Sequence, residues 1–548
     1  MKRILYILFL AASFCAKAQN QTIDPTVEVN RDFQGKIMEI AKGKLNTTIA
    51  DSLNIYNIDF NYSFFDKQYK DLYEFSPLPS ASIVENNGAH EYKFMVKGGM
   101  GTPFTPEAAL WLTPLRGEKD YLSLGGDWEM YKTGLMKEQT YNGRGSYARL
   151  FNWGEGNISV SYNGGSNHNI LEENTDRSYG HNFNRLSLHG SIKPFDARGT
   201  GKKHNWGVSG NYRWTQDKST TRLNENYGII EGYFGPTFGK YSQFTANLAV
   251  RGVEYDGHAD YYYGLFEFAP NYRYEKGELT VQLSAKLSGE FTSKREAKAD
   301  RYHSFIVPDI NLIFTLNRDK LWAYGTLTGD NHLNAWSTLL EQNRYMNPAV
   351  NPNDIFAGST PLDAEAGLKG RSSDKFSYSI FAKYAMHKGM VQYAYNRDGG
   401  WYNAFNSNHN EFGAGADFTS KMQNFLLGGE FLFASYSKGK NSNFANGLPA
   451  CGKPKVSGNL HATYNWKGGI SAGVSCKGWG SYYAAIWNTA ECGKISGNAD
   501  IDINLQYAFV PAFTVYVRGE NILGSPSFNH PFHTGRGGCI IGGIIVKL

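Results

Sequence analysis

The sequence has few cysteines, no long apolar run beyond its first residues, and only a small excess of positive charge. Five cysteines in 548 residues are too few for a fold that depends on disulfides. After residue 18, no apolar run reaches the roughly 20 residues that a membrane-spanning helix needs, which excludes a helical membrane protein. The net charge of +5 is small for this length and argues against nucleic acid as a partner.

Residues 1–18 have the pattern of a secretory signal peptide. Two basic residues precede the apolar stretch 4–12, and a small-residue cleavage site follows at 16–18. Cys15 comes after a bulky aromatic residue, which argues against lipid attachment at this cysteine. We therefore expect an exported chain whose mature part begins near residue 19.

Aromatic residues and glycine are abundant. The chain has 36 Tyr, 34 Phe and 61 Gly, a composition typical of aromatic-rich strands joined by turns. Apolar and polar residues alternate along 243–251, 279–288 and 498–507, and a period of two indicates strands with one apolar face. Soluble β-sandwiches and propellers also alternate, but their strands have roughly five or six residues, whereas crossing a bilayer takes roughly 9 to 11. The sequence therefore predicts an all-β fold, a transmembrane antiparallel β-barrel.

The connections between strands support this fold, because short turns alternate with longer polar loops. We expect short turns at 275–278, 317–320, 466–469 and 510–512, and long loops at 165–183, 331–356, 438–454 and 525–536. If the last strand, 537–548, runs toward the periplasm, every one of these short turns lies inside and every long loop lies outside, as in outer-membrane barrels.

The barrel is predicted to occupy residues 91–548, with about 22 strands and a range of roughly 16 to 24. This number treats 374–397 as one long, bulged strand. A tight turn at 387–389 would instead add a hairpin, and merging weak strands near 106–130 would lower the number.

Four motifs in the C-terminal part of the chain resemble those of one known family. They are Glu365-Ala366-Gly367-Leu368-Lys369, Gly413-Ala414-Gly415-Ala416-Asp417, Pro454-Lys455 with the strand 456–464, and Arg518-Gly519-Glu520-Asn521-Ile522-Leu523. In order and spacing they resemble the barrel of TonB-dependent receptors, especially the compact barrels common in Bacteroidetes, over roughly residues 300–548. The resemblance implies a 22-stranded barrel and the uptake of a solute.

The chain departs from this family before the barrel. The family has a domain-sized plug there, preceded by a short box that engages TonB, whereas only residues 19–90 lie between the signal peptide and the first strand. We therefore expect a plugless barrel, with 19–90 as a periplasmic docking segment, a rudimentary plug or an arm along the barrel wall. Residues 19–28 contain no recognisable box, so direct coupling to TonB is doubtful.

We find no constellation that indicates catalysis, a cofactor or a metal site, and we predict that the chain is not an enzyme. His530 and His533 share a loop, but no third metal ligand is evident nearby. Asp500, Asp502 and Glu430 could be viewed as paired carboxylates, although acidic residues facing the lumen are routine in barrels. No phosphate-binding loop or nucleophile elbow is present in a supporting context.

Polar residues on the alternating strands are predicted to line the lumen. The candidates for a solute route are Arg251, Lys286, Asp500, Asp502 and Arg518.

Two cysteines occur in a repeated Cys-Gly-Lys motif, at 451–453 and 492–494, each where a long outer loop meets a descending strand. A disulfide between Cys451 and Cys492 is compatible with an oxidising envelope. The two loops would have to lean together, because strands two positions apart lie roughly 10 Å from each other. Cys476 and Cys539 are expected to be unpaired.

Two functions remain open for a multi-pass β-barrel of the outer membrane. The first is a receptor-like or porin-like barrel that takes up or passes a solute, and the alternative is a non-transporting structural subunit of an envelope assembly. Expected partners are outer-membrane lipid and lipopolysaccharide, for which the basic cluster 294–298 is suited, and an outer-membrane lipoprotein or other envelope proteins. The sequence does not name a substrate.

Overall fold

The computed structural model describes residues 93–548 apart from short gaps. The gaps are 172–173, 196–203, 219–221, 258–260, 293–302, 319, 348, 350–354, 356, 373–374, 442–443, 488–490, 526–530 and 534. The predicted signal peptide 1–18, the segment 19–90 and the basic cluster 294–298 lie outside the described residues, so what was expected of them stays a prediction.

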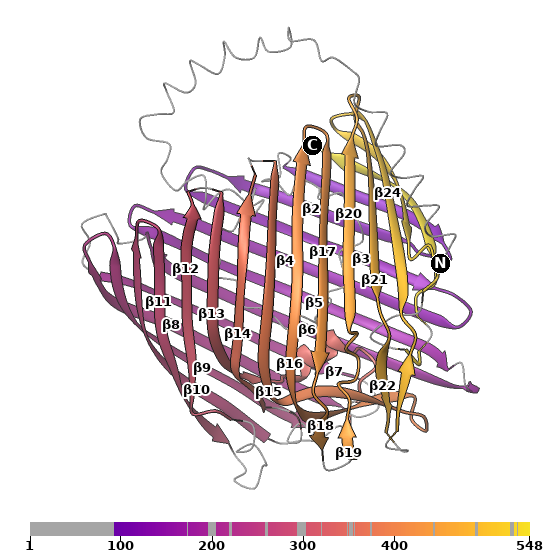
Figure 1. Cartoon of the computed structure of the whole chain (residues 1–548). Helices are drawn as coiled ribbons and strands as arrows, with labels where there is room; N and C mark the ends of the chain where they lie inside the picture. Colours follow the sequence, from indigo (N-terminus) through magenta and orange to yellow (C-terminus); the bar gives the residue numbers. More distant parts are fainter. Residues whose placement is uncertain are drawn as a thin grey trace. The chain divides into compact units, whose positions relative to one another are not determined.

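The described strands form a closed antiparallel barrel (Figure 1). Of its 26 described strands, 22 make up the ring, and each ring strand pairs with the next ring strand along the chain. The ring closes where β1 (Phe94–Thr102) pairs with β26 (Cys539–Lys547). The predicted all-β barrel of about 22 strands is confirmed.

The remaining ring strands follow in chain order. They are β2 (Glu107–Arg116), β3 (Asp120–Lys132), β4 (Met136–Phe151), β5 (Gly154–Leu171), β6 (Asn174–Pro194), β7 (His204–Asp217), β8 (Leu223–Phe238), β9 (Ser242–Gly257), β10 (Tyr261–Lys276), β11 (Leu279–Thr292), β12 (Ile306–Asn317), β13 (Leu321–Leu333), β14 (Ala357–Arg371), β15 (Phe376–Asn396), β16 (Trp401–Met422), β17 (Phe425–Tyr436), β20 (Val456–Asn465), β21 (Ile470–Trp479), β24 (Asn498–Val510) and β25 (Phe513–Glu520).

Four further strands and one helix lie in long connections. They are β18 (Gly439–Asn441), β19 (Phe444–Leu448), β22 (Tyr482–Ile486), β23 (Glu491–Ile495) and α4 (Trp336–Gln342). No helix among the described residues is long and apolar enough to span a membrane. Short turns such as 277–278, 466–469 and 511–512 lie at the end of the ring where the chain terminates, which we call the periplasmic end; the long connections lie at the other, outer end.

Large apolar side chains are exposed along the outside of the ring. On β24, Ile503, Leu505 and Tyr507 are 39–49% exposed, whereas Asn504 between them is 4% exposed. The same outward alternation holds on β9, where Leu248 and Val250 are exposed, and on other strands around the ring. An exposed apolar surface of this extent is unusual in a soluble protein, and on a closed barrel it is the belt that contacts lipid.

β15 is one strand of 21 residues, as the sequence predicted for 374–397. Its register against β16 shifts between His387 and Met390, which is a bulge rather than a turn. Gly389 has φ 67° there, a conformation that glycine adopts without steric strain. The hairpin therefore continues beyond the bulge to Asn396.

The predicted loop at 165–183 is wrong. β5 continues to Leu171 and β6 begins at Asn174, so most of this stretch is a paired hairpin. Polar residues and glycine dominate it, and this composition indicates a loop when strands are recognised by apolar alternation. The pairing needs only backbone hydrogen bonds, so a hairpin can continue after its apolar pattern has ended.

Candidate functional site

The outer end of the barrel is covered by part of its own wall. We call residues 390–407, the part of β15 and β16 beyond the bulge, the mouth hairpin. In this hairpin, exposed and buried side chains no longer alternate, since four consecutive residues are all buried: Ala404, Phe405, Asn406 and Ser407. A strand buried on both faces must be covered from both sides. Figure 1 shows this hairpin turning across the end of the ring that carries β18 and β19.

We call the connection 334–356 the inserted loop, and one face of the mouth hairpin packs on its described residues. Leu339, Met346 and Ala404 belong to one buried apolar cluster, and Val391 and Tyr393 pack against it. The backbone also joins the two elements, because Tyr402 N donates to Tyr345 O at 2.9 Å.

The inserted loop is anchored to the barrel wall through α4. Arg185 of β6 donates to the carbonyl of Ser337 at 2.5 Å and contacts Glu341. The carboxylate of Glu225 on β8 accepts the backbone N–H of Ser337 at 3.2 Å. Because the first N–H groups of a helix have no partner within it, this carboxylate satisfies a donor that would otherwise be lost on burial.

The other face of the mouth hairpin packs on two outer connections. Ala394, Phe405, Cys451 and Ala485 form a buried cluster, with Trp487 and Cys492 against it. β22 pairs in parallel with β15, Ala394 lying opposite Ala485. Cys451 N donates to the side chain of Gln392 at 2.9 Å. The mouth hairpin is therefore held between the inserted loop and the connections 437–455 and 480–497.

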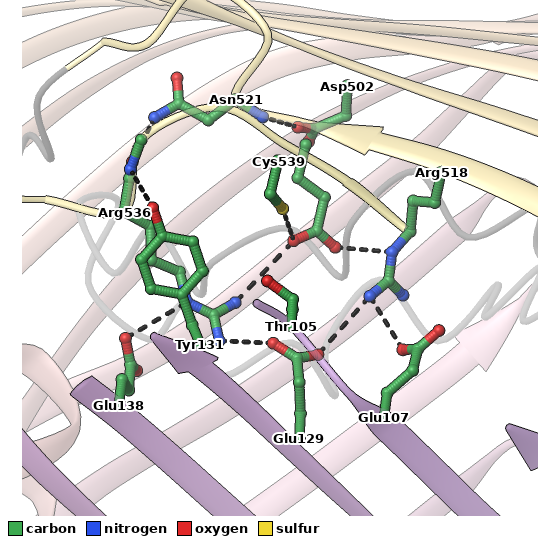
Figure 2. A network of polar contacts seen from close by, with 12 residues as sticks. Thr105, Glu107, Glu129, Tyr131, Glu138, Asp502, Arg518, Asn521, Arg536 and Cys539 are labelled. Atoms are coloured by element: carbon green, nitrogen blue, oxygen red, sulfur yellow. Dashed lines mark hydrogen bonds and ion pairs between the residues drawn. The ribbon is translucent and has the colours of Figure 1, made fainter. Parts of the chain in front are cut away.

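A charged network joins the last outer connection to the wall near the closure of the ring (Figure 2). Arg536 lies 2.5 Å from Glu129, 3.3 Å from Glu138 and 3.8 Å from Glu520. Arg518 of β25 lies 2.7 Å from Glu520 and 3.5 Å from Glu129. We call residues 521–538 the closing loop.

Two further cations complete this network. Lys97 and Arg518 both reach Glu107, at 3.3 and 3.0 Å, and Arg344 of the inserted loop contacts Glu138. Four carboxylates thus face four cations. Buried charges are tolerated when they are paired in this way, and the pairing ties the inserted loop and the closing loop to the same wall.

The same two loops also meet through aromatic rings. The rings of Tyr345 and His533 stack with centroids 4.0 Å apart, and Phe532 stacks on Tyr395 at 4.9 Å. Burial lowers the pKa of His533 to about 4, so the ring is neutral near pH 7. No group of three or more His, Cys, Asp or Glu that could hold a metal occurs among the described residues, and His530 lies outside them.

The predicted lumen residues fall into separate groups. Arg251 and Lys286 converge on Asp330, at 3.5 and 3.7 Å, and Asp500 lies opposite Lys477 in the pairing of β24 with β21.

Asp502 accepts the backbone N–H of Asn521 at 2.8 Å, and Arg518 belongs to the charged network. Neighbouring residues such as Val517 and Ile503 point to the lipid side, so Arg518 and Asp502 lie on the opposite, inner face. That these residues line a route for a solute stays a prediction.

Sequence reasoning missed the residues that close the mouth. Trp336, Leu339 and Leu340 have the spacing of a helix with one apolar face, and this signal inside a loop could have revealed α4. Arg344 and Arg536 gave no such signal, because an arginine in a loop is usually at the surface.

Known proteins resemble this chain in structure but not in sequence. No family model matches the chain, and no curated protein matches it. The copper transporter OprC is 13% identical, with a TM-score of 0.57, over 83% of this chain and 80% of OprC. The pyoverdine outer membrane receptor FpvA of Pseudomonas aeruginosa PAO1 is 10% identical, with a TM-score of 0.61, over 84% of this chain and 79% of FpvA. The ferric-catecholate import receptor Fiu of E. coli K12 is 9% identical, with a TM-score of 0.62, over 84% of this chain and 82% of Fiu.

At such identities the likeness concerns the fold. The chain has the barrel fold of these outer-membrane receptors, and its apolar belt is suited to lipid. The closed ring and its apolar belt make it a multi-pass transmembrane β-barrel.

Proposed function

We propose that this protein is a gated, receptor-like barrel that takes up a solute across the outer membrane. The observation that carries the proposal is the mouth hairpin, a piece of the wall folded across the outer end of a polar lumen and held there by three connections. A ring of about 22 strands encloses a lumen wide enough to leak unless it is filled. The likeness to a copper transporter, a pyoverdine receptor and a ferric-catecholate import receptor supports uptake rather than an enzymatic role.

The contacts that close the mouth are of a kind that a ligand can displace. Ion pairs and hydrogen bonds around Arg536 and Arg185 exchange readily for water or for polar groups of a ligand. A ligand opens such a gate only if it binds the open state more tightly than the closed one. We therefore expect the solute to compete with the loop contacts at the mouth.

The segment 19–90 completes the proposal. The motifs at 365–369, 413–417, 454–464 and 518–523 favour a compact barrel of the Bacteroidetes type. In this proposal the loops provide the outer closure, the segment adds a periplasmic one, and direct coupling to TonB is not required.

Conductance in planar bilayers tests whether the lumen is a passage. The wild-type protein should give a low, steady baseline. A variant in which residues 391–406 are replaced by a short Gly-Ser turn should give conductance steps several times larger, because the mouth hairpin is gone. The matched control carries the same turn inserted at 467–468, at the periplasmic end of the ring.

The structural alternative makes the opposite prediction. Its support is the complete pairing of the charged network, which suits a permanently closed barrel. If the folded hairpin variant stays closed, also when residues 19–90 are removed as well, the barrel is not a passage and acts as a subunit of an envelope assembly.

A further inference from the structure

The repeated Cys-Gly-Lys motif builds one small pocket at the outer end of the barrel. The pocket holds about 120 Å³ and is lined by Lys453, Lys455 and Lys494, together with the hydroxyl-bearing residues Tyr436, Ser481 and Tyr483. Its lining contains three lysines and no aspartate or glutamate. A lining that carries three ammonium groups and no carboxylate favours the binding of an anion.

Backbone pairing explains why lysines from distant parts of the chain meet here. Cys451 forms a parallel bridge with Tyr483, and Gly452 N donates to Tyr483 O at 2.7 Å. Gly452 has φ 67°, which turns the chain so that Lys453 follows at the pocket. On β23, Lys494 lies directly opposite Tyr483.

The pocket lies against the inner face of β17. On β17, Phe431 and Phe433 are exposed to the lipid side, so Ala434, which lines the pocket, lies on the opposite face. The phosphates of lipopolysaccharide lie outside the ring, among the lipid headgroups. A solute that enters the mouth can reach the pocket without crossing the wall.

Two of the three lysines in the pocket, Lys455 and Lys494, carry the charge that an anion can meet. Lys453 interacts electrostatically with the carboxylate of Glu411, which also pairs with His387 at 2.8 Å. Lys455 and Lys494 form no ion pair with the described residues. Their ammonium groups supply the charge, and the hydroxyl groups supply further donors for oxyanion oxygens.

We propose that this lysine pocket binds a phosphate or carboxylate group of a small soluble solute. The inference rests on the proposed uptake function and names the chemical class of its substrate. Lys455 and Lys494 contact the anion, and the paired loops that carry Cys451 and Cys492 position them.

Calorimetry on the purified full-length protein in a zwitterionic detergent, at low salt, tests the pocket with inorganic pyrophosphate and citrate as probes. Saturable binding of at least one probe is expected, weakened by added salt. The double variant K455Q/K494Q should weaken it at least about tenfold, since two charge-assisted contacts are lost. K455R/K494R should retain it. The matched control is K467Q, in the periplasmic turn of the same strand pair, which should bind as the wild type does.

Two results would overturn the assignment. One is the absence of probe binding, or binding that does not depend on Lys455 and Lys494. The other is displacement of the probe by purified lipopolysaccharide, which would make the pocket a headgroup site. Neither result affects the conductance expected of the hairpin variant. A failure of this inference can therefore be distinguished from a failure of the proposed uptake function.

Discussion

The Sγ atoms of Cys451 and Cys492 lie 3.9 Å apart, although 41 positions separate them along the chain. Both are free thiols in this structure. Strands two positions apart are too distant for such a contact, and the parallel bridge between Cys451 and Tyr483 supplies the approach of the loops that the pairing needs. A disulfide requires the sulfurs to approach by only about 2 Å more.

We expect these two cysteines to be joined in protein isolated from an oxidising envelope. Peptide mapping of unreduced protein should recover the cross-linked pair, while Cys476 reacts with an alkylating reagent. C451S should loosen the connections 437–455 and 480–497, and a loop of this length corresponds to about 2–4 kcal/mol of stabilisation. C476S is the matched control. Full alkylation of both Cys451 and Cys492 before reduction would contradict the prediction.

Replacing Arg536 should release the closing loop. In R536A, Glu138 keeps only Arg344, and Glu129 and Glu520 each lose one cation (Figure 2). Leaving the buried Glu138 and the partly buried Glu129 and Glu520 short of a partner should destabilise the docked loop by about 2–3 kcal/mol.

Hydrogen exchange at Gly537 reports this release, because its N–H donates to the hydroxyl of Tyr131 at 3.1 Å. Exchange should accelerate in R536A. The control is R273A, which removes a partly exposed pair with Glu275 that contributes little. Equal exchange rates in the two variants would show that Arg536 does not hold the loop.

Acid should loosen the same loop through His533. Its ring is 95% buried against Tyr345, Tyr395 and Tyr402, and burial lowers its pKa from 6.5 to about 4. Between these values the unfolded loop binds more protons than the docked one, so docking is strongest above about pH 6.5 and weakens as the pH falls toward 4. The largest loss is about 3 kcal/mol.

Limited proteolysis of the closing loop between pH 7.5 and 5 measures this effect. Cleavage should increase as the pH falls in the wild-type protein. H533F keeps an aromatic ring on Tyr345 but cannot be protonated, and its cleavage should not change with pH. A pH dependence retained in H533F would assign the effect to another group.

The wall of the barrel could be predicted from the sequence, whereas its closure could not. Alternation depends on residues two apart, so the lipid face of 498–507 is visible in the chain itself. The contacts of Arg536 with Glu129 and Glu138 join positions roughly 400 residues apart, and no local pattern records them. The bulge at Gly389 could be predicted in part. The glycine indicates an irregularity in the chain, but only the strand pairing distinguishes a bulge from a turn.

The packing of Trp336 on α4, which sequence analysis did not predict, can be tested by mutation. Trp336 is 2% exposed and packs in the cluster that joins the inserted loop to β9 and β10. W336A removes a large buried ring, which should destabilise the docked loop by about 3–5 kcal/mol. The ring of strands should stay intact, because α4 lies in a connection between two of its strands.

We therefore expect W336A to keep the heat-modifiable migration of a folded barrel while hydrogen exchange in 336–342 accelerates and baseline conductance rises. The matched control is W466A. Trp466 lies in a periplasmic turn and its side chain is 46% exposed, so its replacement should change neither property. If W336A shows unchanged exchange and conductance, the inserted loop does not depend on this packing. The closure of the mouth would then rest on the charged network and on the connections 437–455 and 480–497.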